Sequence, residues 1–94
     1  MQLKVDHNPE YRQFTTVVEG RTSFLQYGER GERLLEYRST YVPPEVRGRG
    51  IATKLVRHAL DYAQTKGFRI IPTCWFVASV IDKNPEYAEL VKRR

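Results

Sequence analysis

The fold of this chain is decided by the stretch Val42-Pro43-Pro44-Glu45-Val46-Arg47-Gly48-Arg49-Gly50-Ile51-Ala52-Thr53-Lys54-Leu55-Val56. This pattern predicts the end of a strand, a tight loop with two glycines, and the start of an amphipathic helix. Glycine suits a loop whose backbone bends sharply and approaches a ligand closely. The helix start adds unpaired N–H groups and the positive end of the helix dipole. The stretch therefore predicts an anion site, typically for phosphate, and the alternative is an ordinary turn that enters a helix.

The helix itself is indicated by apolar residues that recur at i, i+3 and i+4. This predicted buried stripe consists of Ile51, Ala52, Leu55, Val56, Ala59, Leu60 and Ala63. Gly67 is the expected residue just past the helix end, and residues 68–72 predict a buried strand. Because a helix then joins two strands, a right-handed crossover with parallel strand pairing is expected.

The N-terminal half predicts an antiparallel meander, with strands at residues 2–6, 11–19, 22–27 and 33–42 and a turn at residues 7–9. In the last of these strands, Leu35, Tyr37, Ser39 and Tyr41 are expected to share one face. Residues 75–83 predict a helix, and residues 85–91 predict a short final helix with Asn84 as its N-cap. The expected fold is α/β (α+β): one domain over residues 1–94, with a mixed, mostly antiparallel sheet of about five strands, one crossover helix and short C-terminal helices.

Composition limits the possible partners of this 94-residue chain. A single cysteine excludes an intrachain disulfide and favours a reducing, cytoplasmic setting. No segment has the length and hydropathy of a membrane span, so a soluble protein with no membrane partner is expected. One cysteine and two distant histidines have no metal-ligand spacing, so no metal site is expected. The net charge of +5 favours anionic partners. Nothing distinguishes a monomer from a weak dimer.

Several segments resemble one known family. Arg47-Gly48-Arg49-Gly50-Ile51-Ala52 matches the Arg/Gln-x-x-Gly-x-Gly/Ala motif of the GNAT superfamily of N-acetyltransferases. The segments Val42-Pro43-Pro44, Ile71-Pro72-Thr73-Cys74-Trp75-Phe76 and Asn84-Pro85-Glu86-Tyr87 also resemble a compact GNAT-like family, so the likeness covers roughly residues 10–91. It implies acetyl-coenzyme A or coenzyme A as the ligand. The residues that it implies for coenzyme A binding are Tyr41, Val42, Arg47, Gly48, Arg49, Gly50, Ile51, Ala52 and Thr53.

Cys74 lies where the resemblance places the acyl group. It could accept that group from the thioester as a nucleophile, or it could be a small buried side chain that only lines the site. Tyr87 is the candidate proton donor to the departing thiolate, because other GNAT proteins use a tyrosine in the terminal helical region. The alternative for Tyr87 is packing of the last helix.

The chain departs from its expected relatives before the two prolines. They commonly read His-Thr-Glu/Gly-Val, whereas this chain reads Ser39-Thr40-Tyr41-Val42. No histidine or carboxylate stands there, so the general base is not identified. Trp75 replaces the proline that usually follows the cysteine. It is expected to pack in the core, and the alternative is that it narrows the acceptor side.

The resemblance implies an acetyl-coenzyme A-dependent N-acyltransferase that moves an acetyl group to an amine of a protein or a small molecule. The alternative is a non-catalytic module that binds coenzyme A or acyl-coenzyme A. A nucleic-acid binder is disfavoured, because the basic residues cluster at one loop and helix instead of alternating with aromatic residues.

Overall fold

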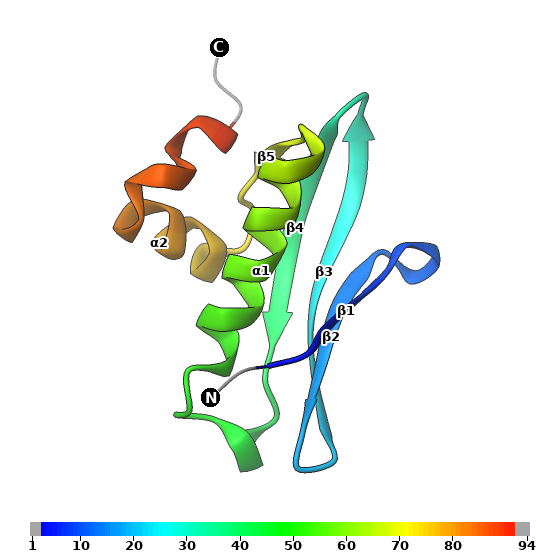
Figure 1. Cartoon of the computed structure of the whole chain (residues 1–94), viewed down its shortest axis with the longest axis vertical. Helices are drawn as coiled ribbons and strands as arrows, with labels where there is room; N and C mark the ends of the chain where they lie inside the picture. The colour runs from blue at the N-terminus through cyan, green and yellow to red at the C-terminus, as the bar shows by residue number, and fades with distance from the viewer. Residues whose placement is uncertain (1–2, 92–94) are drawn as a thin grey trace.

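The computed structural model describes residues 3–91, which form a five-stranded sheet with helices against it (Figure 1). In spatial order the strands are β1 (Val5–Asn8), β2 (Gln13–Val18), β3 (Arg21–Gly31), β4 (Leu34–Tyr41) and β5 (Arg69–Ile71). The first four strands pair antiparallel, and β5 pairs parallel with β4. The predicted mixed, mostly antiparallel sheet is therefore confirmed.

Two α-helices and three short 3₁₀ helices complete the described chain. They are η1 (Pro9–Tyr11), η2 (Pro44–Val46), α1 (Ile51–Lys66), α2 (Trp75–Lys83) and η3 (Pro85–Leu90). Helix α1 joins β4 to β5 and crosses one face of the sheet, with α2 and η3 beside it (Figure 1). This arrangement is the predicted crossover. No helix within residues 3–91 is long and apolar enough to cross a membrane.

The core lies between α1 and the sheet. The predicted stripe of α1 is buried, except that Ala52 is only partly so. Its residues from Leu55 to Ala63 pack in one cluster with Phe14, Leu25 and Tyr37 of the strands. Removal of this apolar surface from water is the main stabilising contribution to the fold. The fully buried Tyr37 hydroxyl also donates a hydrogen bond to the Ala59 carbonyl at 2.6 Å. Helix α1 is thereby fixed in position over β4.

A β-bulge in β4 corrects one expectation. Tyr37 pairs with Tyr27, but Ser39 pairs with Gln26, so Arg38 is an extra residue. The bulge shifts the alternation of side chains by one position. Thr40 therefore lies opposite the buried Leu25 and takes the inner face. The prediction that Ser39 and Tyr41 share a face with Leu35 and Tyr37 was wrong, because both are exposed.

Two predicted element boundaries also change, and one predicted cap forms without its side chain. Residues 7 and 8 belong to β1 instead of a turn, and residue 2 of the predicted strand lies outside the described residues. Strand β3 continues to Gly31 instead of ending at residue 27, since the hairpin turn comes later. Asn84 is the N-cap residue of η3 as predicted, but its side chain makes no capping hydrogen bond: its amide donates to the Val80 carbonyl and its oxygen accepts from Arg57.

Candidate active site

The loop between β4 and α1 leaves the start of α1 without a side-chain cap. Gly48 and Gly50 adopt φ values of 83° and 77°, a left-handed conformation that glycine adopts without strain. Gly50 is the N-cap residue of α1, and no side chain caps that end. Within residues 3–91, the N–H groups of residues 48–50 have no hydrogen-bond acceptor. The first N–H groups of α1 also lack partners in the helix, so several donors are available to an anion.

Two arginines of the loop are held by other parts of the protein. Arg47 donates from Nε to the Val42 carbonyl at 2.8 Å, and its guanidinium lies 6.0 Å from the centre of the Tyr41 ring. Arg47 thus closes the loop onto the end of β4. Arg49 forms a bidentate ion pair with Glu19 of the β2–β3 turn, at 2.5 and 3.3 Å. This hydrogen-bonded pair lowers the pKa of Glu19 and raises the pKa of Arg49.

Two adjoining pockets extend from this loop. The loop pocket, of about 220 Å³, is lined by Val42, Val46, Arg47, Gly48, Gly50, Ile51, Ala52, Thr53 and Phe76. The cysteine pocket, of about 250 Å³, is lined by Thr40, Tyr41, Val42, Arg47, Ala52, Cys74, Trp75 and Phe76. They share Val42, Arg47, Ala52 and Phe76, so an elongated ligand could extend from the start of α1 to the thiol of Cys74.

The cysteine pocket lies where β4 and β5 separate. Their parallel ladder covers only Leu34–Glu36 against Arg69–Ile71. Beyond it, the Cys74 N–H donates to the Tyr37 carbonyl at 3.0 Å, and the Thr73 hydroxyl donates to Glu36. These two bonds tie the β5–α2 loop to β4. The Thr73 hydrogen bond, with Arg38 and Arg30 nearby, lowers the pKa of Glu36.

Cys74 is the N-cap residue of α2, and its side chain is 8% exposed. Its sulfur lies 3.6 Å from the Thr40 hydroxyl, which the bulge in β4 turns inward. Thr40 is the only described side chain within hydrogen-bond distance of this sulfur. A thiol, a hydroxyl and the start of a helix therefore meet at the inner end of the pocket.

Two of the residues that line the cysteine pocket, Tyr41 and Trp75, are exposed aromatic side chains. Trp75 is 77% exposed, so the prediction that it packs in the core was wrong, and Tyr41 is 42% exposed. Tyr41 packs on Phe24 with ring centres 5.5 Å apart, and Trp75 contacts Phe76 edge-on at 5.6 Å. Aromatic faces attract organic cations as well as apolar groups. The opening therefore suits an alkylammonium group or an apolar segment.

Tyr87 lies apart from these pockets, on η3 against the outer side of α1. Its buried hydroxyl donates to Asp61 Oδ1 at 2.7 Å, and the Arg57 guanidinium lies 5.6 Å from the ring centre. Burial and the bond to Asp61 raise the pKa of Tyr87 to about 12. In this conformation the hydroxyl is committed to Asp61 and does not line the cysteine pocket.

The structure thus gathers most of the predicted residues around one connected space. Those that line the two pockets are Tyr41, Val42, Arg47, Gly48, Gly50, Ile51, Ala52, Thr53 and Cys74. Arg49 turns to Glu19 instead, and Tyr87 is elsewhere. Sequence reasoning missed Thr40, Val46 and Phe76 as lining residues. Phe76 is two residues after Cys74 in the segment quoted for the family resemblance, so it could have been predicted to line the site. The inward orientation of Thr40 depends on a β-bulge that the local sequence does not signal. Among the described residues no cluster of histidine, cysteine and carboxylates could hold a metal.

Comparisons with known proteins agree with this geometry. The sequence model of the GCN5-related N-acetyl-transferase family matches residues 12–90. Protein NATD1 from Bos taurus is 35% identical over 85 residues, which cover 88% of this chain and 75% of that protein. Protein NATD1 from Homo sapiens is 34% identical over 85 residues, with the same coverage of 88% and 75%. The solution structure of a GCN5-like protein from Staphylococcus aureus matches with a TM-score of 0.73 at 18% identity, covering 97% of this chain and 89% of that one. That likeness concerns the fold.

Proposed function

The chain belongs to the GCN5-related N-acetyl-transferase family, and we propose that it transfers an acetyl group from acetyl-coenzyme A to an amine. The observation that carries the proposal is the uncapped start of α1, which opens into a space that leads to Cys74. The phosphate groups of the ligand would fit the end at the start of α1, and its reactive thioester would fit the end at Cys74.

The pyrophosphate would bind at the N–H groups of residues 48–53. A Cβ atom built on Gly48 or Gly50 meets nothing within 4 Å, so the backbone is open to a ligand there. The helix dipole and the free N–H groups both favour negative charge at this point. Arg47 and Arg49 would act mainly by holding the loop, since Val42 and Glu19 occupy their polar groups.

The thioester would lie in the cysteine pocket, between the separating strands. In direct transfer, the amine nitrogen forms a bond to the acetyl carbon, the bond from that carbon to the coenzyme A sulfur breaks, and an amine proton ends on the released thiol. Here the protein acts chiefly by holding the thioester in place and restricting its motion relative to the amine. The exposed rings of Trp75 and Tyr41 would receive the acceptor by cation–π contact and apolar packing.

A covalent route would use Cys74 as an intermediate acceptor. Its sulfur would form the new thioester, and coenzyme A would leave as the thiol with the cysteine proton. The amine nitrogen would then bond to the acetyl carbon, the bond from that carbon to the Cys74 sulfur would break, and an amine proton would restore the Cys74 thiol. Thr40 is positioned to hold the thiol proton, at 3.6 Å. Tyr87 remains a predicted proton donor only if its hydroxyl leaves Asp61.

A module that binds coenzyme A without turnover is the second candidate. It is favoured by one observation: among residues 3–91, no imidazole or carboxylate lines the cysteine pocket. An amine acceptor would then have to arrive unprotonated or give its proton to solvent. Binding without acetylation of any amine would be the expected behaviour of such a module.

Mass spectrometry after incubation with acetyl-coenzyme A tests both candidates. The protein, Cys74→Ala and Cys74→Ser are incubated with and without a panel of primary amines, and protein and amine masses are measured. Acetylated amine formed by all three proteins supports direct transfer. Acetylated amine formed only with Cys74 present, together with acetylated protein, supports the covalent route. Bound coenzyme A with no acetylated product from any amine in the panel favours the binding module, and no binding at all overturns both.

A further inference from the structure

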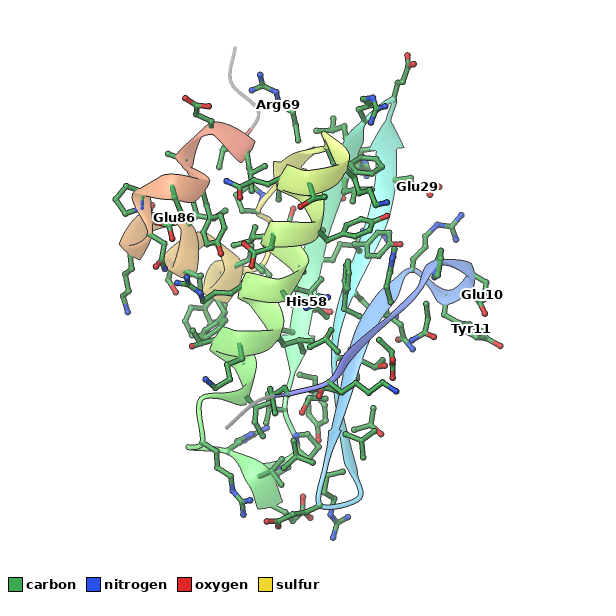
Figure 2. All side chains as sticks on the ribbon, viewed as in Figure 1. Glu10, Tyr11, Glu29, His58, Arg69 and Glu86 are labelled. Carbon is green, nitrogen blue, oxygen red and sulfur yellow. The ribbon has the colours of Figure 1, made fainter. Side chains whose placement is uncertain are left out.

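A groove of about 450 Å³ lies between α2 and η3, and none of its lining residues belongs to the loop pocket or the cysteine pocket. Figure 2 shows Glu86 on η3, on the side of α1 opposite strands β1 and β2. The apolar lining of this α2–η3 groove consists of Pro72, Ala78, Ile81, Pro85, Ala88 and Val91. Among the described residues, Asp82 is the one charged side chain that lines it.

The α2–η3 groove adjoins the cysteine pocket along one face of α2. Pro72 lines the groove, and Cys74, two residues later, lines the cysteine pocket. Trp75, Ala78 and Asp82 follow the spacing i, i+3, i+7, so they share one face of the helix. Trp75 lines the cysteine pocket, whereas the other two line the groove. With a rise of 1.5 Å per residue, Asp82 is about 12 Å along the helix axis from Cys74. This helix face therefore leads from the thiol to the carboxylate.

Asp82 is available to a cationic ligand. It is exposed, and no described cation lies within ion-pair distance of it. Glu86 on η3, by contrast, pairs with Arg57 at 3.6 Å. The chain carries a net charge of +5, so the Asp82 carboxylate gives this groove the opposite sign to the molecule as a whole. Next to it, the apolar walls can contact an aliphatic side chain. The groove thus suits a segment that has both an aliphatic and a basic side chain.

We propose that the α2–η3 groove holds a short extended segment of a protein acceptor, with a basic side chain on Asp82 and an aliphatic side chain against the apolar walls. The inference rests on the proposed function, which puts the thioester in the cysteine pocket. A small amine would reach only that pocket. A polypeptide can present a lysine amine there, past the exposed Trp75 ring, and continue along α2 into the groove.

The length of this path sets the spacing of the recognised residues. An extended chain advances about 3.3 Å per residue, so the path of about 12 Å from Cys74 to Asp82 corresponds to roughly four residues. We therefore expect the basic residue to be about four positions from the acetylated lysine, with the aliphatic residue between them.

A series of blocked peptides tests the groove. Each peptide has one lysine, one leucine two positions away, and one arginine placed two to six positions from the lysine on either side. N-acetyl-lysine amide is the small-amine reference, and acetylation by acetyl-coenzyme A is measured by mass spectrometry. For the unmodified protein we expect the best peptide to have a kcat/KM roughly tenfold above that of the reference, because the groove contacts add binding energy. This maximum should occur near a spacing of four, on one side of the lysine.

Substitutions of Asp82 test its role in this selectivity. Asp82→Asn should lower the kcat/KM of the best peptide about twofold to fivefold, as expected for an exposed ion pair, and should abolish the dependence on arginine position. Asp82→Lys should instead prefer a peptide with glutamate in place of the arginine. Glu89→Gln is the matched control, since Glu89 is exposed on η3 but does not line the groove. It should behave as the unmodified protein does, and all variants should acetylate the reference amide at the same rate.

The outcomes separate this inference from the function on which it rests. If the unmodified protein acetylates the amide and every peptide with equal kcat/KM, the groove is not a docking surface, and the proposed function stands. An unchanged dependence on arginine position in Asp82→Asn, with its melting temperature unaltered, would likewise overturn the assignment of the groove. No acetylated product from the amide or from any peptide would overturn both the transfer activity and the docking surface.

Discussion

Gly50 is the position at which the proposed phosphate site can be tested most directly, by substitution with alanine. Its φ of 77° is left-handed, and a Cβ built there meets no protein atom within 4 Å. An alanine would therefore strain the backbone and project a methyl group into the space that the phosphate would occupy. The first effect acts on folding, and the second acts on binding.

Gly67→Ala is the matched control for the strain. Gly67 ends α1 with a φ of 80°, and a Cβ there would lie 3.4 Å from the flexible Arg33 side chain, an ordinary contact. A left-handed alanine costs about 1–2 kcal/mol, so each variant should melt roughly 4–16 °C lower in a domain of this size. The two variants should thus lose similar stability at opposite ends of one helix.

Only Gly50→Ala should lose affinity for coenzyme A. Loss of hydrogen bonds to a charged phosphate corresponds to weakening on the order of 10- to 100-fold. Titration calorimetry below the melting range measures this loss, and thermal unfolding followed by circular dichroism measures the strain. If Gly50→Ala binds coenzyme A as tightly as Gly67→Ala does, the β4–α1 loop is not the phosphate site.

Two further predictions concern the β5–α2 loop and η3. Thr73→Val removes the hydrogen bond to Glu36 that ties this loop to β4, so Cys74 should react several-fold faster with iodoacetamide. Thr73→Ser keeps the hydroxyl, so its Cys74 should react at the rate of the unmodified protein. Equal rates for all three proteins would refute the role of this bond. The pKa of Tyr87 is raised in the folded state to about 12, from an ordinary value of about 10. The protonated hydroxyl of Tyr87 therefore contributes its full stabilisation below pH 10, and this stabilisation is lost as the pH rises through 12. Urea unfolding from pH 9 to 12 should therefore show a steeper loss of stability in the unmodified protein than in Tyr87→Phe, and parallel curves would contradict the link between Tyr87 and Asp61.

Several features were predictable from the sequence because they depend on local chemistry. The apolar stripe of α1 follows from the helical period, and Gly67 ends the helix as expected. The glycines at 48 and 50 predicted a sharply bent loop next to a helix start, and the structure has this loop, with positive φ at both residues. The parallel pairing of β4 with β5 followed from the strand–helix–strand order.

Other features depend on residues that are distant in the chain. The bulge at Arg38 arises from the register between β3 and β4, and only this shift turns Thr40 toward Cys74, 34 residues later. In the same way, the commitments of Arg49 to Glu19 and of Tyr87 to Asp61 span 30 and 26 residues. Periodicity and spacing in the sequence predict which face of a helix or strand a side chain occupies. They do not predict which atom of a different helix or strand that side chain contacts.

The sequence by itself therefore determined the bent loop and the uncapped helix start at which we propose that an anion binds, since both are properties of a few consecutive residues. The tertiary structure decided the rest of the site: it brought Thr40 to Cys74 and separated Tyr87 from them. The physical reason is that hydrogen bonds and ion pairs act over a few ångströms, so partners are chosen by packing of the whole sheet and its helices.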